Sequence, residues 1–209
     1  MNNTKKIIMV LDTETADLTG SIYDIGYTIT DKRGNIAATR NWLVEEIFTD
    51  AKKMMGAFYA GKIFSHYAPM LQRGDIELTS WSTIVETMRT DILEHGVNIL
   101  AAYNLPFDTR VMRNTHSALG YTDKILPHSL DQLCIWQFAC ETKLNTRLYK
   151  ELAQAQGWVS EAGNIRTGAE YAYRFCAGDW GFIEDHTALS DAIIETEILA
   201  RCFATNAKV

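Results

Sequence analysis

The sequence lacks the segments that usually divide a chain into domains or direct it to a membrane. Only three of its 209 residues are proline, and no stretch is rich in proline or in glycine and serine. The apolar run Ile7–Leu11 is shorter than the core of a secretory signal, and no run approaches the length that spans a bilayer. We therefore expect a single domain over residues 1–209, with its core between about residues 6 and 203, in the cytoplasm of a bacterium or of a phage-infected host and without a membrane partner.

Cysteine pairs and an excess of positive charge are also missing. The four cysteines form no C-x-x-C pair, which argues against a zinc site and favours buried thiols in a reducing compartment. The formal net charge is −6, whereas a protein that coats nucleic acid is normally basic. An enzyme that uses bound metal ions is compatible with this charge, because the ions supply positive charge where the substrate lies.

The hydrophobic pattern predicts an α/β fold. Ile7–Leu11 is continuously apolar and ends at Asp12, as expected of a buried central strand. Apolar residues alternate between Tyr23 and Ile29, and a third strand follows from Ile36 to Val44. Later strands are expected at 97–102 and 125–130, and helices at about 81–95, 106–119, 131–141 and 147–156 and from about 189. We predict a mixed central sheet of about five strands flanked by helices.

Two acidic residues follow the first predicted strand. Residues Asp12 and Glu14 are two positions apart, so on a strand their side chains point to the same side. Carboxylates held together repel each other unless a cation lies between them, and hard oxygen ligands suit Mg²⁺ or Mn²⁺. By itself the pair is more often solvated than metal-binding.

Two further motifs lie where predicted strands or loops lead into helices. Asn104 and Phe107 precede Asp108 at a strand–helix junction, where ligands gather in open α/β sheets. His186 stands five residues before Asp191 at the start of the last helix. Singly, each aspartate could serve only as a favourable charge at a helix N-terminus, and His186 could be a surface imidazole.

In combination the three motifs resemble those of the DEDDh exonucleases, which include the epsilon proofreading subunit, RNase T and oligoribonuclease. The family pattern has D-x-E, then N-x-x-F-D, then H-x-A-L-x-D-A, and all three occur here in that order across nearly the whole chain. The resemblance implies an RNase H-like fold and a 3′→5′ exonuclease that releases nucleoside 5′-monophosphates. The sister class has tyrosine where this chain has Thr187, so His186 is the expected base.

The resemblance also implies roles for individual residues. Asp12, Glu14, Asp108 and Asp191 would hold two Mg²⁺ ions, for which Mn²⁺ could substitute, with Asp12 bridging them. His186 would take a proton from the attacking water, a task that suits imidazole because its pKa lies near neutrality. The residues expected to contact the substrate are Thr13, Thr15, Leu18, Asn104 and Phe107.

The sequence leaves the substrate open. Residues 45–80 suggest only short helices or loops and have no counterpart in the family, so we expect this variable segment to influence substrate preference. The 3′ end of single-stranded DNA is the first candidate, because an end must enter a narrow site, and RNA is the alternative. A non-catalytic module that binds nucleic acid or a polymerase is a third interpretation. Whether the chain acts alone, as a homodimer or with a polymerase is not indicated.

Overall fold

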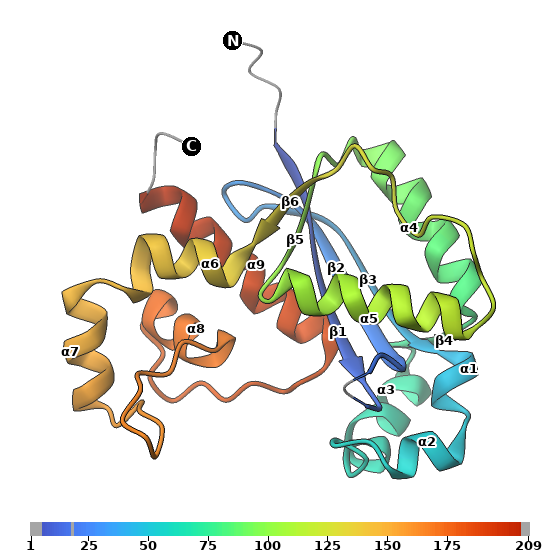
Figure 1. Ribbon diagram of the computed structural model, residues 1–209, viewed down its shortest axis with the longest axis horizontal. Coiled ribbons are helices and arrows are strands. Elements are labelled where there is room, and N and C mark those ends of the chain that lie inside the picture. The colour runs from blue at the N-terminus through green and yellow to red at the C-terminus, as the bar shows by residue number, and fades with distance from the viewer. Residues whose placement is uncertain (1–5, 18, 206–209) are drawn as a thin grey trace.

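A computed structural model describes residues 6–17 and 19–205. In this part of the chain six strands form one mixed sheet in the order β4-β3-β2-β1-β5-β6 (Figure 1). The strands are β1 (Ile7–Thr15), β2 (Ile22–Asp31), β3 (Ile36–Val44), β4 (Glu77–Thr79), β5 (Ile99–Ala102) and β6 (Asp131–Cys134). The first three form an antiparallel meander, and β5 lies parallel to β1 and β6 parallel to β5. The predicted α/β class, with helices flanking a mixed sheet, is confirmed, with one strand more than expected.

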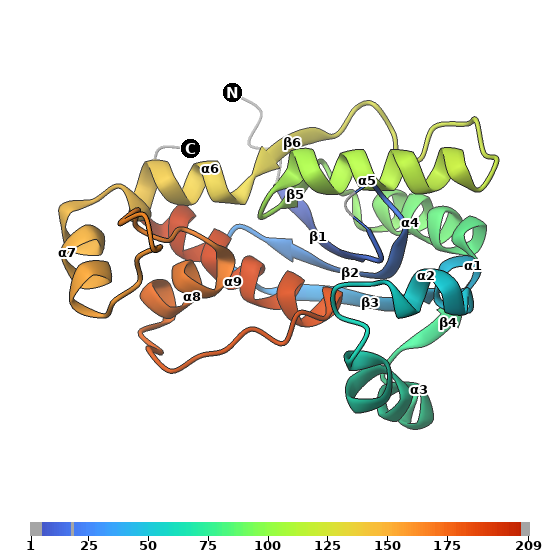
Figure 2. The same cartoon turned by 60° about the horizontal axis from the view of Figure 1, so that its bottom comes forward.

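Helices cover both faces of this sheet. They are α1 (Glu45–Phe48), α2 (Ala51–Met55), η1 (Ile63–Tyr67), α3 (Ala68–Arg73), α4 (Trp81–His95), α5 (Leu105–Ala118), α6 (Ile135–Ala139), η2 (Cys140–Leu144), α7 (Arg147–Ala155), α8 (Ala169–Ala177) and α9 (Ala188–Thr205), where η marks a π-helix. Figure 2 shows α4 and α5 on one side of the sheet and α9 on the other. Short elements from 45–80 gather at the end of the sheet where β1 ends (Figure 1). No helix among the described residues has the length and apolar character needed to cross a membrane.

The alternation of side chains along β1 divides the core into two layers. Met9 and Leu11 pack on the side of α4 and α5, with Trp81 among the buried residues there. Ile8 and Val10 belong to the other layer, which includes residues of α6, α8 and α9. Because side chains of a strand point alternately to opposite faces, Asp12 and Glu14 continue the row of Ile8 and Val10 toward α9. The position of α9 therefore decides what the two carboxylates meet.

One glycine allows α9 to lie directly on the sheet. Gly26 of β2 stands opposite Asp12 in the β1–β2 register. A Cβ atom at Gly26 would lie 2.4 Å from the backbone nitrogen of Leu189 and 2.7 Å from its Cα. Two residues farther along β2, the hydroxyl oxygens of Thr28 and Thr196 are 2.6 Å apart and form a buried hydrogen bond between the sheet and α9.

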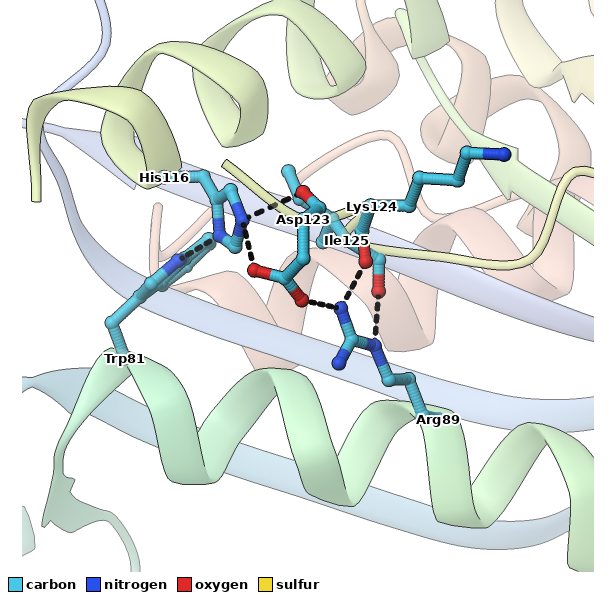
Figure 3. A network of polar contacts seen from close by, with 6 residues as sticks. All are labelled: Trp81, Arg89, His116, Asp123, Lys124 and Ile125. Carbon is cyan, nitrogen blue, oxygen red and sulfur yellow. Dashed lines mark hydrogen bonds and ion pairs between the residues drawn. The ribbon is translucent and has the colours of Figure 1, made fainter. Parts of the chain in front are cut away.

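The last edge strand differs from the expectation. Residues 125–130 were predicted as a strand, but β6 begins at Asp131, and the helix expected from about residue 131 begins at Ile135. The segment before β6 is held by side chains instead of by strand pairing (Figure 3). Arg89 of α4 donates to the carboxylate of Asp123 and to the carbonyl oxygens of Lys124 and Ile125.

A buried histidine completes this network. His116 of α5 is 5% exposed, and its Nδ1 accepts a hydrogen bond from Trp81 Nε1 at 2.9 Å. Its Nε2 therefore carries the proton, and this N–H donates to the carbonyl oxygen of Asp123 at 2.9 Å. Figure 3 shows how these contacts join α4, α5 and the segment that leads to β6.

We predict that Gly26→Ala lowers the free energy of unfolding by about 3 kcal/mol, because the added methyl group meets the backbone of α9 and not a side chain that can rotate away. Urea unfolding followed by circular dichroism would measure the change. Gly61→Ala is the matched control, since a Cβ atom there has no neighbour within 4 Å. Equal stability of the two variants would contradict the close approach of α9 to β2.

Candidate active site

The sequence-predicted carboxylates meet at the end of β1. Asp12 and Glu14 lie on β1, Asp108 in the first turn of α5 and Asp191 in the first turn of α9. Asp108 and Asp191 are buried, with 3% and 5% exposure. The negative charges of Asp108, Asp191 and Glu14 all act on Asp12. The structure thus gathers the four acids that the three motifs supply.

Three of the predicted residues form a tighter group. One potential ligand atom from each of Glu14, His186 and Asp191 lies within 4.8 Å of the other two. Carboxylate oxygens and an imidazole nitrogen are donors that divalent ions such as Mg²⁺ and Mn²⁺, or softer transition metals, can use. Asp12 and Asp108 extend this donor set toward β5 and α5, so the residues present fit the binding of divalent cations.

Burial and mutual repulsion hold the protons on these acids when no cation is bound. Burial, followed by the charge of Asp191, raises the pKa of Glu14 to about 9. Burial, followed by the charge of Glu184, raises the pKa of Asp191 to about 8. Burial raises the pKa of Asp108 to about 7. The pKa of Asp12 lies well above its usual value, because its environment is desolvated and because the charges of four acids act on it. A bound cation would reverse these shifts by favouring the ionised forms.

A fifth carboxylate belongs to the cluster and was not predicted. Glu195 lies one helical turn after Asp191 on α9 and is 2% exposed. Its Oε2 accepts a hydrogen bond of 3.0 Å from the backbone nitrogen of Tyr103, just after β5. After burial, its charge is the largest influence that raises the pKa of Asp12. The signal in the sequence was an acid four residues after Asp191, on the same face of the helix, which is mostly apolar and buried.

A second unpredicted acid supports the turn that leads into α9. Asp24 of β2 is fully buried and stands opposite Glu14. Its Oδ2 accepts hydrogen bonds from the backbone nitrogen of Ala188, at 3.0 Å, and from the hydroxyl of Tyr67, at 2.9 Å. Asp24 therefore ties the start of α9 to both the sheet and η1.

His186 has an unusual backbone conformation. Its φ is +52°, in the left-handed region, and among the described residues it is the one non-glycine residue with a positive φ. Its Nδ1 lies 3.5 Å from Oε2 of Glu184, whose pKa is raised to about 7, chiefly by burial. Burial, and next the positive charge of Lys62, lower the pKa of His186 below its usual value. The imidazole is therefore neutral at physiological pH and able to accept a proton.

The residues predicted to contact substrate are placed as follows. The Thr13 side chain is buried, and its hydroxyl donates to Oδ1 of Asp108 at 2.8 Å. Thr15 is partly exposed at the end of β1, after an irregularity in its pairing with β2. Asn104 is exposed just before α5, and Phe107 is partly buried against the core with the guanidinium of Arg110 5.3 Å from its ring centre. Leu18 lies outside the described residues.

The chain was compared with protein-family models, with curated proteins and with solved structures. No family model matches the chain, and no curated protein matches it. Among solved structures it is similar to Exonuclease X in complex with 5′ overhanging duplex DNA, with 20% sequence identity over 97% of this chain and 94% of that one, and with a TM-score of 0.49. At this level of similarity, conclusions about function depend on the chain's own residues.

We predict that the metal-free protein loses stability as the pH rises. Glu14, Asp191 and Asp108 have pKa values of about 9, 8 and 7 in the folded chain, above their values of about 4 when unfolded. The folded state therefore binds more protons across this interval, and its stability falls as the pH rises from about 4 to 9. Urea unfolding in EDTA should give a lower free energy at pH 8.5 than at pH 6.

Addition of Mg²⁺ should remove most of this loss, because the cation binds the ionised cluster. Asp12→Asn should weaken both the pH dependence and the stabilisation by Mg²⁺, whereas Glu94→Gln, on the exposed surface of α4, should change neither. Stability that rises between pH 6 and 8.5 in EDTA would contradict the gathering of these acids.

Proposed function

We propose that the chain is a metal-dependent 3′→5′ exonuclease that releases nucleoside 5′-monophosphates, with the 3′ end of single-stranded DNA as its first candidate substrate. The observation that carries this proposal is the convergence of Glu14, His186 and Asp191, whose ligand atoms lie within 4.8 Å of one another. Asp12 and Asp108 stand beside them, so all five residues of the three sequence motifs meet at one place. Such a meeting is not required by the packing of the core.

The residues fit hydrolysis of a phosphodiester bond. Divalent cations bound by Asp12, Glu14, Asp108 and Asp191 would polarise the phosphate and lower the pKa of a water molecule. His186 accepts the proton of the attacking water, and its lowered pKa leaves its imidazole neutral for this purpose. Glu184 lies at 3.5 Å from Nδ1 of His186 and orients the ring. Cations bound by the cluster would also place positive charge where the substrate phosphate lies.

Two features support action on a strand end. The direction follows from the resemblance of the three motifs to the DEDDh enzymes. In addition, Tyr59 and Lys62, from the variable segment 45–80, lie against His186. Their side chains occupy space beside the proposed base, which favours a terminal nucleotide over the middle of a long strand.

Asp12→Ala should abolish turnover and leave the fold intact, because it removes a repelling carboxylate at the centre of the cluster. We expect a loss of at least about 10³-fold in the rate at which 5′-labelled oligonucleotides shorten in Mg²⁺. DNA and RNA of the same sequence should be compared, and EDTA should stop the reaction. Near-normal activity in Asp12→Ala, with Glu94→Gln as the matched control, would refute the assignment.

His186→Ala should lower kcat by about 10²–10⁴-fold, because the attacking water loses its proton acceptor. Binding of Mn²⁺, followed by titration calorimetry, should be largely retained, since the carboxylates supply most of the donor set. A variant that lost metal binding and kept its rate would show that His186 is a ligand and not the base.

A further inference from the structure

The variable segment 45–80 contributes a lysine that holds the backbone of the proposed base. Lys62 Nζ donates hydrogen bonds to the carbonyl oxygens of Asp185 and of His186, the latter at 3.0 Å. These carbonyl groups flank the left-handed residue His186. A non-glycine residue keeps such a conformation only when its surroundings fix it. Lys62 is thus placed to stabilise a strained turn.

The same segment also holds the imidazole ring. The rings of Tyr59 and His186 are stacked, with their centres 4.9 Å apart and their planes 19° from parallel. Lys62 Nζ lies 4.2 Å from the centre of the Tyr59 ring, in a cation–π contact. One ammonium group therefore contacts both the backbone of His186 and the aromatic ring that covers its side chain.

Local hydrogen bonds shape the chain that carries Tyr59 and Lys62. The backbone nitrogen of Ala60 donates to Ala57, that of Lys62 to Tyr59, and that of Ile63 to Ala60. These turns place the two side chains three residues apart, on one side of the chain. The segment then enters η1, where Tyr67 reaches Asp24. The variable segment is thereby connected to the start of α9 at two points.

We propose that Lys62 and Tyr59 are positioning residues that hold the imidazole of His186 toward Glu14 and Asp191. The proposal rests on the proposed function, since it takes His186 as the base. The alternative role for Lys62 is direct contact with the substrate phosphate. Two of its hydrogen bonds are made to carbonyl oxygens of the loop itself, which favours the positioning role.

A double-mutant cycle distinguishes these roles, because residues that act through one group are not additive. Lys62→Met keeps the apolar stem and should lower kcat by about 10–100-fold, with KM changed less than kcat. In the His186→Ala background the same substitution should have no further effect on the residual rate. An equal loss in both backgrounds would overturn the proposal in favour of direct contact with the substrate.

Substitutions of Tyr59 provide a second test of the positioning role. Tyr59→Ala removes the stack and should lower kcat, and Tyr59→Phe keeps the ring and should recover most of that loss. Lys53→Met is the matched control, because Lys53 is an exposed residue of α2 in the same segment. If Lys53→Met lowered kcat as much as Lys62→Met, the effect would belong to the segment in general and the proposal would fail.

A measurement without substrate separates this proposal from the proposed function. The NMR signal of the His186 Cε1 proton, assigned by its loss in His186→Ala, senses the ring current of Tyr59. It should shift in Tyr59→Ala and Lys62→Met and stay in place in Lys53→Met. A shifted signal in a protein without metal-dependent hydrolysis would refute the proposed function alone. An unchanged signal in an active protein would refute the positioning role alone.

Discussion

Repulsion between carboxylates that lie close together, whenever they are ionised, is the constraint on which the arrangement of this chain depends. Asp12, Glu14, Asp108, Asp191 and Glu195 come from three elements and meet at the end of the central strand. A cluster of this kind does not hold itself together, so the surrounding fold must supply the attraction. The two apolar layers on either side of β1 supply this attraction. The contact at Gly26 fixes the distance between α9 and β2. Packing of the apolar core therefore stabilises the fold, and the acidic cluster at one end of the sheet opposes it.

The motifs could be located from the sequence because the residues of each motif are close together in the chain and lie at the end of a predicted strand or at the start of a predicted helix. Asp12 and Glu14 follow an unbroken apolar run, and Asp191 opens a helix whose apolar residues recur at helical spacing. That these residues meet depends on strand order, which local patterns do not encode. The resemblance to a family implied that the three motifs share one site, and in the sheet β1 lies between β2 and β5.

Contacts over long sequence distances account for what the sequence did not reveal. Glu195 lies on the buried face of α9, and only its place beside Asp12 identifies it as a member of the acidic cluster. Residues 125–130 include three aliphatic side chains, which suggested a strand, but the side chains of Arg89 and His116 hold the turn at Asp123–Ile125 by hydrogen bonds. The support of His186 by Lys62 joins residues 124 positions apart, and no periodicity in 45–80 marks it.

The edges of the sheet have a consequence for how the chain meets other molecules. On one side the sheet ends in β4, with three residues, and on the other in β6, with four. Edge strands have unpaired backbone N–H and C=O groups that can pair with another chain, and a very short edge strand has few of these groups. On the β4 side, however, β4 pairs only with Trp42–Val44 of β3, so within the described part of the chain residues 36–41 of β3 have no strand beside them on that edge. Association of this sheet with another strand would therefore involve that stretch of β3, whereas β4 and β6 offer little for it.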